Sequence, residues 1–285
     1  MVRCIKTELW KATHNIYFIL AIGVGFSLVF CNIMETYKIT SGLTHQSIEC
    51  QHLGLPIYQF TGCSLFVWWI AHNGINFGSI CYYQIWPIIA ALPYAWSYSQ
   101  ESSAGIFSQY CSRSTRKQYF MAKYLAVFVS GGLVAALPIW LDLILNALIC
   151  PAEKLQFMNA LTTIENRSFL SALFYTHPWI HALVWCAVEM LWGGSVASLS
   201  FLLGKKLRFS VFAVLFPFSL LYVLAVVGDV FKQFTDTNLE LNPMQLAMQA
   251  PMGVNPGWLI FSFIFLFSIL SFIYGYWLVV KHDFL

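Results

Sequence analysis

Residues 257–280 read GWLIFSFIFLFSILSFIYGYWLVV, a run that contains no charged side chain. A helix needs about 20 mostly apolar residues to cross the hydrocarbon core of a bilayer, so this run predicts a transmembrane helix. The sequence does not favour a β-barrel, because apolar and polar residues do not alternate along a series of strand-length segments. The sequence therefore predicts an all-α polytopic membrane protein with six transmembrane helices, at residues 16–34, 79–99, 121–146, 179–203, 209–229 and 257–280.

The composition supports this class and argues against several others. Hydrophobic residues make up 59% of the chain and charged residues only 9%, whereas a soluble domain carries about a quarter charged residues. The net charge of +3 is modest and its basic residues lie in short clusters beside apolar runs, which argues against nucleic-acid binding. No polar stretch is long enough for a soluble domain, so residues 1–285 are predicted to form a single transmembrane domain.

The eight cysteines do not indicate a metal or redox site. They form no CxxC pair and no His/Cys cluster with the spacing of zinc ligands. Most are interpreted as small apolar residues of the helices. Cys50, Cys63 and Cys150 are expected to face outward, and a disulfide among them stays open.

The distribution of Lys and Arg predicts the orientation of the chain. Cytoplasmic loops are enriched in these residues, and an even number of spans places both ends on the same side. With both ends inside, eleven of the fifteen Lys and Arg residues are cytoplasmic: Arg3, Lys6, Lys11, Arg113, Arg116, Lys117, Lys123, Lys205, Lys206, Arg208 and Lys281. The outer side then holds Lys38, Lys154, Arg167 and Lys232. We therefore expect a multi-pass protein of the cytoplasmic membrane with both termini in the cytoplasm.

Residues 57–72, IYQFTGCSLFVWWIAH, are apolar but too short for a comfortable span. Counting them as a seventh span moves the basic N-terminus outside. We interpret them as an outer interfacial or re-entrant segment that leads into the second span. Trp68 and Trp69 are then expected at the level of the lipid headgroups.

Residues 3–14, RCIKTELWKATH, precede the first span and place Ile5, Leu9 and Trp10 near one helical face. This pattern favours a short helix along the inner membrane surface. The alternative is a frayed, positively charged flank of the first span.

The connection after the second span, QESSAGIFSQYCSRSTRKQYFMAKYLAVF at residues 100–128, carries the most information about function. Glu101 and the two serines after it suit the start of a helix. Apolar residues then recur at helical spacing, at Ile106, Phe107 and Tyr110, and a basic cluster follows. An amphipathic helix in a cytoplasmic loop needs lipid or a protein partner to cover its apolar face, whereas a simple positive loop explains only the charges.

This region resembles the signature region of permease subunits of the ABC-two class of ABC transporters. The resemblance rests on PIIAALPYAWSYSQESSAG at residues 87–105 and SRSTRKQYFMAKY at residues 112–124. In that family the second span runs into a cytoplasmic coupling helix, which is followed by an Arg-rich entry to the third span. The residues that match this pattern are Glu101, Gly105, Arg113 and Lys123. Over the rest of the chain the resemblance is one of layout, including an outer segment at residues 230–256 before the last span.

The resemblance implies a permease that is not itself an enzyme. The chain has no G-x-x-x-x-G-K-[ST] phosphate loop, so ATP and magnesium are expected in a separate ATP-binding-cassette ATPase subunit. That subunit is expected to dock on the coupling helix, and a second permease subunit, the same or related, is expected to complete the pathway. The implied activity is export of hydrophobic or amphipathic substrates such as antimicrobial peptides, in bacteriocin export or self-immunity, in a bacterial membrane. The residues expected to couple to the ATPase are Glu101, Gly105, Ile106, Phe107, Tyr110 and Arg113.

Two acidic residues are candidates for an intramembrane pathway. Glu189 lies midway along a predicted span, where placing an ionisable side chain costs free energy. A functional role is therefore the first hypothesis for this residue. The alternative is a neutral Glu that hydrogen-bonds to a neighbouring helix. Asp142 lies nearer the outer end of the third span, where hydration suffices to explain it.

Other patterns in the fourth span have structural interpretations. His177 and His181 are four residues apart, as metal ligands on one helix face can be, but no third ligand is indicated. We expect them to mark the start of the span, with Pro178 in its first turn. The small residues Gly193, Gly194, Ala197 and Ser198 predict close helix packing rather than a ligand site.

Two other functions stay open on the sequence. An ion-coupled secondary transporter that uses Glu189 as a proton relay needs no ATPase, although the two halves of the chain show no convincing repeat. A membrane-embedded immunity or interaction protein that transports nothing is the third alternative.

Overall fold

The computed structural model describes residues 2–53, 64–103, 115–152, 164, 168–203, 210–235, 238–249 and 254–281. The described residues are helical apart from turns and one isolated bridge between Leu239 and Val254. The helices in chain order are α1 (Val2–Thr13), α2 (Ile16–His52), α3 (Leu65–Trp68), α4 (Phe77–Ala91), α5 (Ser97–Ser103), α7 (Arg116–Ile149), α8 (Ser171–Thr176), α9 (Pro178–Ser198), η2 (Leu199–Leu202), α10 (Ser210–Thr235), α11 (Pro243–Met248), α12 (Gly257–Tyr276) and η4 (Trp277–Lys281). The predicted all-helical class is confirmed.

Five of the described helices are long and apolar enough to cross a membrane, at Ile16–His45, Arg116–Ile149, Pro178–Leu202, Val211–Thr235 and Gly257–Val280. They correspond to five of the six predicted spans. Apolar side chains of Ile16–His45, Val211–Thr235 and Gly257–Val280 are largely exposed, which suits contact with lipid chains, whereas Arg116–Ile149 is half buried and Pro178–Leu202 is mostly buried inside the bundle. The protein is therefore a multi-pass membrane protein by the length and composition of its helices.

The second predicted span, residues 79–99, is not one continuous helix. Helix α4 contains 15 residues, about 22 Å at 1.5 Å per residue, which is shorter than the hydrocarbon core. It ends before Pro93, which has no backbone N–H for a bond to the preceding turn. Residues 92–96 form a turn, and α5 begins at Ser97. Helix α4 is therefore not among the described helices that are long enough to cross a membrane, and the six-span topology stays a prediction.

Side chains satisfy two of the carbonyl groups at this break. The indole nitrogen of Trp96 donates to the carbonyl oxygen of Leu92 at 3.1 Å. The amide nitrogen of Asn15, at the junction of α1 and α2, donates to the carbonyl oxygen of Pro93 at 3.0 Å. The first bond lies within the turn, and the second holds the turn against the start of α2.

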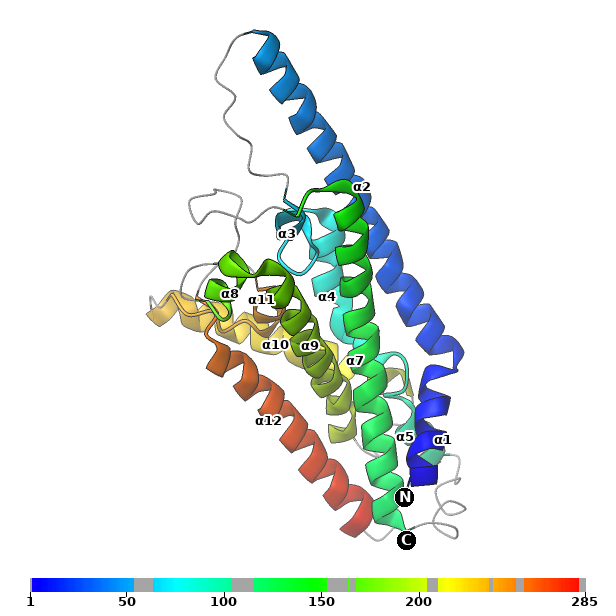
Figure 1. Cartoon of the computed structure of the whole chain (residues 1–285). Helices are drawn as coiled ribbons and strands as arrows, with labels where there is room; N and C mark the ends of the chain where they lie inside the picture. Colours follow the sequence, from blue (N-terminus) through cyan, green and yellow to red (C-terminus); the bar gives the residue numbers. More distant parts are fainter. Residues whose placement is uncertain are drawn as a thin grey trace.

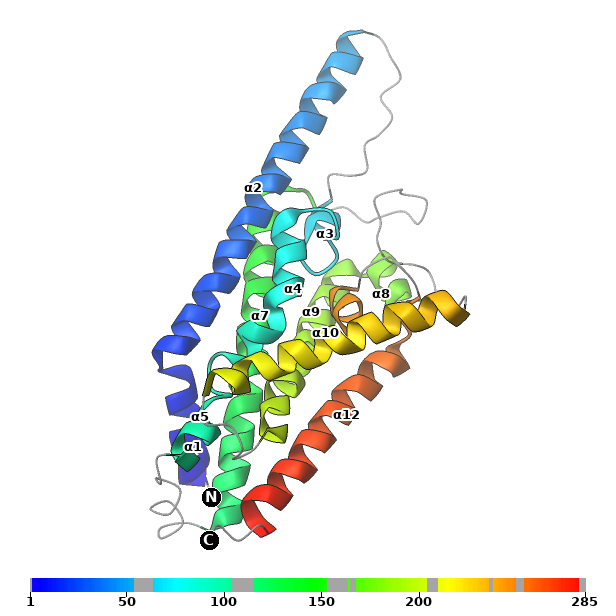
Figure 2. The same ribbon diagram turned by 180° about the vertical axis from the view of Figure 1, so that it is seen from behind.

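Helix α7 is the centre of the bundle and contacts α1, α2, α3, α4, α9 and α12. Figure 1 shows α7 and α2 running side by side, with α12 on the other side and the end of α2 projecting beyond the other helices. We call the end of the bundle that holds α1, α5 and the last turns of α12 the α1 end, and the opposite side, with α3, α8 and α11, the α3 end. Figure 2 shows α10 crossing the bundle obliquely, from near α5 towards α8.

Small residues bring α7 and α9 into close contact. An added Cβ on Gly131 clashes with the side chain of Ala197, and one on Gly193 clashes with Ala135. Backbone atoms of the facing helix block a Cβ on Gly194 in the same way, at Phe128. These close approaches confirm the predicted role of the small residues of the fourth span. Such packing matters because dispersion contacts drive helix association in lipid.

The segment around α3 differs from its expected place. Trp68 and Trp69 are both buried in the hydrophobic core, and the indole nitrogen of Trp69 donates to the carbonyl oxygen of Ile139 on α7 at 2.9 Å. The two tryptophans therefore lie inside the protein and not on its lipid-facing surface, and their level in the membrane stays a prediction. Hydropathy cannot distinguish burial in lipid from burial in protein, and a hydrogen-bonded indole suits the protein interior. Residues 57–63 of the predicted segment, with Cys63, lie outside the described residues.

Helix α1 is confirmed as a helix, and its placement along the inner membrane surface stays a prediction. Glu8 and Ala12 are buried against α7, whereas Trp10 is largely exposed. Cys150, expected to face outward, is buried at the end of α7. In both cases contacts with another helix decide the exposure, which a local pattern does not record.

Candidate functional site

Lys123 lies two turns after the start of α7, and its side chain is 0% exposed. The N-terminus of that helix is fixed by Thr115, whose hydroxyl accepts a bond from the backbone N–H of Gln118 at 3.3 Å. An ammonium group buried among aromatic side chains is very costly unless anions and hydrogen-bond acceptors surround it. The fully buried ammonium group of Lys123 therefore needs anionic partners nearby, and its contacts show which residues supply them.

Two carboxylates from two other helices contact this ammonium group. Its nitrogen Nζ lies 2.9 Å from Oε2 of Glu8 on α1 and 2.7 Å from Oε1 of Glu101 on α5. The three helices meet only because α4 breaks and turns α5 towards the start of α7. Lys123 thus ties α1, α5 and α7 together at the α1 end.

Two tyrosines complete the shell around the three charges. The hydroxyl of Tyr94 donates to Oε2 of Glu8 at 2.7 Å, and that of Tyr119 donates to Oε2 of Glu101 at 2.6 Å. Lys123 also donates to the hydroxyl of Tyr94 at 3.2 Å and lies 4.6 Å from the centre of its ring. We call Glu8, Tyr94, Glu101, Tyr119 and Lys123 the Lys123 cluster.

A second cation, Lys11 at the edge of the cluster, balances the second carboxylate. Lys11 lies one turn after Glu8 on α1, and its nitrogen is 2.9 Å from Oε1 of Glu8. Burial acts to raise the pKa of Glu8, but the charge of Lys123 and the bonds from Lys11, Lys123 and Tyr94 outweigh it, so the pKa is lowered. Glu8 is therefore held as a carboxylate at neutral pH.

The cluster brings together two residues of the predicted family pattern, Glu101 and Lys123, which the sequence matched separately. The other predicted coupling residues, Gly105, Ile106, Phe107, Tyr110 and Arg113, lie outside the described residues. Sequence reasoning missed Glu8. One signal was present, because Glu8 and Ala12 are four residues apart and therefore share a face of the N-terminal helix.

Glu189 faces the interior of the bundle, and the residue is 2% exposed. The hydroxyl of Tyr83 on α4 donates to its Oε1 at 3.3 Å. One turn away on each side of α9 lie Trp185 and Trp192, both buried. Glu189 therefore sits at the contact between α4 and α9 and not on the lipid-facing surface, as expected for an ionisable residue at that depth.

Asp142 is 0% exposed, so the interpretation that hydration explains it is wrong. Its Oδ1 accepts from the amide of Asn32 on α2 at 2.9 Å, and its Oδ2 accepts from the amide of Asn146 at 2.8 Å. The backbone N–H of Ile70, just after α3, donates to the same Oδ2 at 2.7 Å. Asp142 therefore fastens the α3 segment and α2 to α7, because three donors replace the water that the carboxylate loses.

The two histidines of α9 have different surroundings. His177 is exposed at the helix start, followed by Pro178 in the first turn as predicted. His181 is buried against Phe174, His72 and Trp185. The ring centroids of His181 and His72 lie 5.0 Å apart. Among the described residues, no group of three or more His, Cys, Asp and Glu side chains is arranged to hold a metal ion. His177 and His181 therefore do not converge on one site.

The Lys123 cluster is the strongest candidate for a functional site, because it joins three helices through a buried charge. Comparison with protein-family models, with curated proteins and with solved structures found no match to this chain. The function must therefore be inferred from the residues themselves. The ammonium group, the two carboxylates and the two tyrosine hydroxyls of the cluster bond to one another and so fasten α1, α5 and α7 together.

Proposed function

We propose that this protein is the transmembrane subunit of an ABC transporter of the ABC-two class, which exports hydrophobic or amphipathic substrates. A separate ATP-binding-cassette ATPase subunit supplies the energy, and a second permease subunit completes the pathway. The observation that carries this proposal is the 2.7 Å ion pair between Glu101 and Lys123. These are the acid of the resembled coupling segment and the base of the following span, and the pair gives that segment a rigid attachment to the bundle.

The proposed mechanism runs through the Lys123 cluster. The ATPase docks on the segment after Glu101, for which the sequence predicts an apolar face of Ile106, Phe107 and Tyr110. When ATP binding moves that segment, α5 moves with it. Because Glu101 is bonded to Lys123, the displacement reaches α7, the helix that contacts most of the bundle. The second carboxylate, Glu8, passes the same displacement to α1.

The proposal places the α1 end in the cytoplasm, in agreement with the predicted excess of Lys and Arg on that side. The proposed substrates are amphipathic molecules such as antimicrobial peptides, exported as a product or removed for self-protection. The support for this class is the apolar, aromatic-rich interior between α4, α7 and α9, in which Trp86, Trp185 and Trp192 are buried. Such an interior suits apolar side chains better than ions.

Co-purification from native membranes tests the proposal. Tagged protein is expected to retain an ATPase subunit, and the double variant Phe107→Asp, Tyr110→Asp is expected to lose it, because the apolar docking face is destroyed. After reconstitution in vesicles, Glu101→Gln is expected to keep the ATPase bound but to reduce transport per ATP hydrolysed. Lys117→Met, an exposed position on α7, is the matched control for a change of charge near the site. Transport by vesicles that contain no ATPase overturns the proposal.

A specific observation also favours an ion-coupled transporter. Glu189 is buried and bonded to Tyr83 across the α4–α9 contact, as a proton-relay carboxylate needs to be. The two functions differ in their energy source. An ion-coupled carrier moves substrate in response to a proton gradient without ATP, and an ABC transporter does not.

A further inference from the structure

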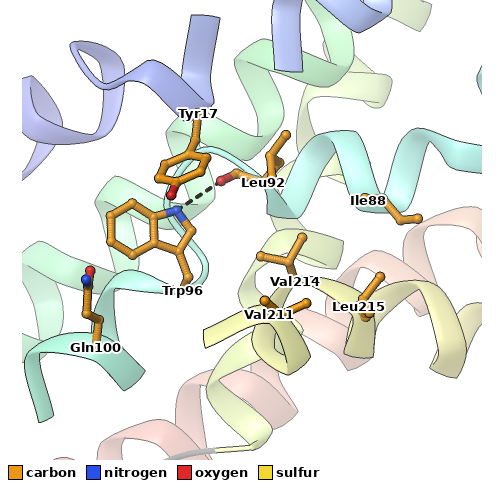
Figure 3. Close-up of a pocket in the computed structure, with 8 residues that line it drawn as sticks. All are labelled: Tyr17, Ile88, Leu92, Trp96, Gln100, Val211, Val214 and Leu215. Atoms are coloured by element: carbon orange, nitrogen blue, oxygen red, sulfur yellow. Dashed lines mark hydrogen bonds between the residues drawn. The ribbon is translucent and has the colours of Figure 1, made fainter. Parts of the chain in front are cut away.

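A pocket of about 350 Å³ lies beside the break between α4 and α5, and nothing in the proposed mechanism uses it. It is lined by Tyr17 of α2, by Ile88, Leu92, Trp96 and Gln100 of the α4–α5 segment, and by Val211, Val214 and Leu215 of α10. Figure 3 shows these side chains converging from the three segments. The volume lies within the range of about 300 to 1,000 Å³ that is usual for small-molecule sites.

The open side of the pocket, its mouth, lies between α2 and α10. Tyr17, Val211 and Leu215 are exposed, and all three belong to helices that are long and apolar enough to span it. Opposite the mouth lie Leu92, which is half-buried, and Val214, which is buried. A ligand can therefore enter sideways from the hydrocarbon between α2 and α10.

The lining is amphipathic along the direction of α4. Ile88 and Leu92 come first, and Trp96 and Gln100 follow towards the α1 end. Figure 3 shows the same order, with the amide of Gln100 and the ring of Trp96 at one end and the aliphatic side chains of Ile88 and Leu215 at the other. The rings of Tyr17 and Trp96 meet edge to face, with centroids 5.1 Å apart. Aromatic residues with one polar atom are typical of the headgroup level of a membrane.

We propose that this pocket binds one acyl chain of a phospholipid from the leaflet at the α1 end. The chain lies between α4 and α10 with its end near Ile88 and Leu215, and the headgroup lies near Gln100. A phospholipid is the occupant because the apolar end of the pocket points away from the α1 end, as an acyl chain of that leaflet does. The mouth, between apolar helix faces, opens to hydrocarbon and not to water.

The occupied pocket affects the α4–α5 break directly. Leu92 and Trp96 are the two partners of the hydrogen bond at that break, and Gln100 is next to Glu101 of the Lys123 cluster. A bound acyl chain packs against this turn and holds it in its bent form. The lipid is therefore a structural ligand of the segment that carries Glu101, whether or not an ATPase docks there.

Photolabelling in vesicles tests the proposal without any ATPase, so its failure is separate from that of the proposed function. The purified protein is placed in vesicles of phosphatidylethanolamine and phosphatidylglycerol with a trace of phosphatidylethanolamine that carries a diazirine at the end of one acyl chain. Mass spectrometry then locates the adducts. We expect adducts on Ile88 and Leu92, which lie behind α10, and a diazirine near the headgroup is expected to shift them towards Trp96 and Gln100.

Filling the mouth is the matching mutational test. The double variant Val211→Trp, Leu215→Trp places large side chains at exposed positions, so folding is expected to tolerate it. Labelling of Ile88 and Leu92 should fall by about tenfold, the change expected when roughly two buried methylenes lose their contacts. Val223→Trp is the control, because Val223 is on the same helix and 58% exposed, against 64% for Val211, but does not line the pocket.

Three outcomes overturn the proposal. The first is the absence of adducts on Ile88 and Leu92 while the exposed face of α10 is labelled. The second is equal labelling of these two residues in the double variant and in Val223→Trp. The third is labelling by a photoreactive fatty alcohol added from water but not by the phospholipid, which assigns the pocket to a single-chain substrate instead.

Discussion

The ammonium nitrogen of Lys123 lies 2.7 Å from Oε1 of Glu101, a residue 22 positions earlier on a different helix. The same nitrogen lies 2.9 Å from Glu8, a residue 115 positions away. A charge with no exposure thus has its partners on two helices: α5, which the break after α4 brings to the start of α7, and α1, which packs against α7. The predictions below follow from this cluster, from the other buried carboxylates and from the distribution of charge.

Replacing Lys123 by Met is expected to destabilise the protein strongly. The change leaves two carboxylates facing each other without their cation, and breaking a buried ion pair in this way costs about 3 to 5 kcal/mol. Thermal unfolding of the purified protein in detergent measures the loss. Lys117→Met on the exposed face of the same helix should change the midpoint little. Adding Glu8→Gln and Glu101→Gln to Lys123→Met should recover much of the stability, and no recovery contradicts the assigned pairing.

Glu8 is expected to make stability depend on pH in the acid range. Its pKa is lowered in the folded protein from the ordinary value of 4.5, because Lys123, Lys11 and Tyr94 outweigh its burial. The folded state therefore binds fewer protons than the unfolded chain, so the contribution of Glu8 is complete above pH 4.5 and is lost as the pH falls through the lowered value. Unfolding midpoints measured from neutral pH downward should show this loss in the native protein. Glu8→Gln should be less stable at neutral pH and should lack this part of the decline.

Asp142→Asn is expected to loosen the α3 segment. One of the two carboxylate oxygens becomes a donor, so it repels either the N–H of Ile70 or an amide of the two asparagines, Asn32 and Asn146. An unsatisfied buried group costs about 1 to 3 kcal/mol. Hydrogen exchange of the peptide that contains Ile70, followed by mass spectrometry, should speed up. Asp229→Asn, at an exposed position on α10, is the control and should leave that peptide unchanged.

Glu189→Gln separates the two candidate functions. Gln keeps the shape of Glu and an acceptor oxygen for Tyr83, but it cannot carry a proton. We expect ATP-driven transport and its pH dependence to survive this change, whereas Glu189→Leu should impair folding or narrow the substrate range. Transport assays on reconstituted protein, with expression and ATPase assembly as controls, measure the result. Loss of transport in a well-assembled Gln variant supports the proton-relay function instead.

Single cysteines test the predicted orientation. In a background without native cysteines, Lys117→Cys is expected to react with an impermeant thiol reagent only after the cells are opened. Cysteines at Lys154 and Asp236, which lie outside the described residues, are expected to react in intact cells. This pattern follows from the excess of Lys and Arg on one side. Labelling of position 117 in intact cells contradicts the placement of the α1 end in the cytoplasm.

The sequence by itself determined the class of the protein and most of its long helices. An uninterrupted apolar run of the length of residues 257–280 has one stable solution in a bilayer, because lipid offers no hydrogen bonds to the backbone. The same local reasoning located the close packing of the fourth span, since only small residues let two backbones approach. These properties depend on residues that are close together in the sequence, so they can be predicted from one sequence alone.

Only the tertiary structure decided which polar residues meet and which apolar residues are covered. Trp68 and Asp142 have the hydropathy expected at a membrane surface, yet both are buried, because α3 folds back onto α7. The pairing of Glu8 and Glu101 with Lys123 depends on the break at Pro93 and on the packing of α1 against α7. Charges are placed by partners that lie far away in the chain, so their burial follows from the assembled fold and not from local spacing.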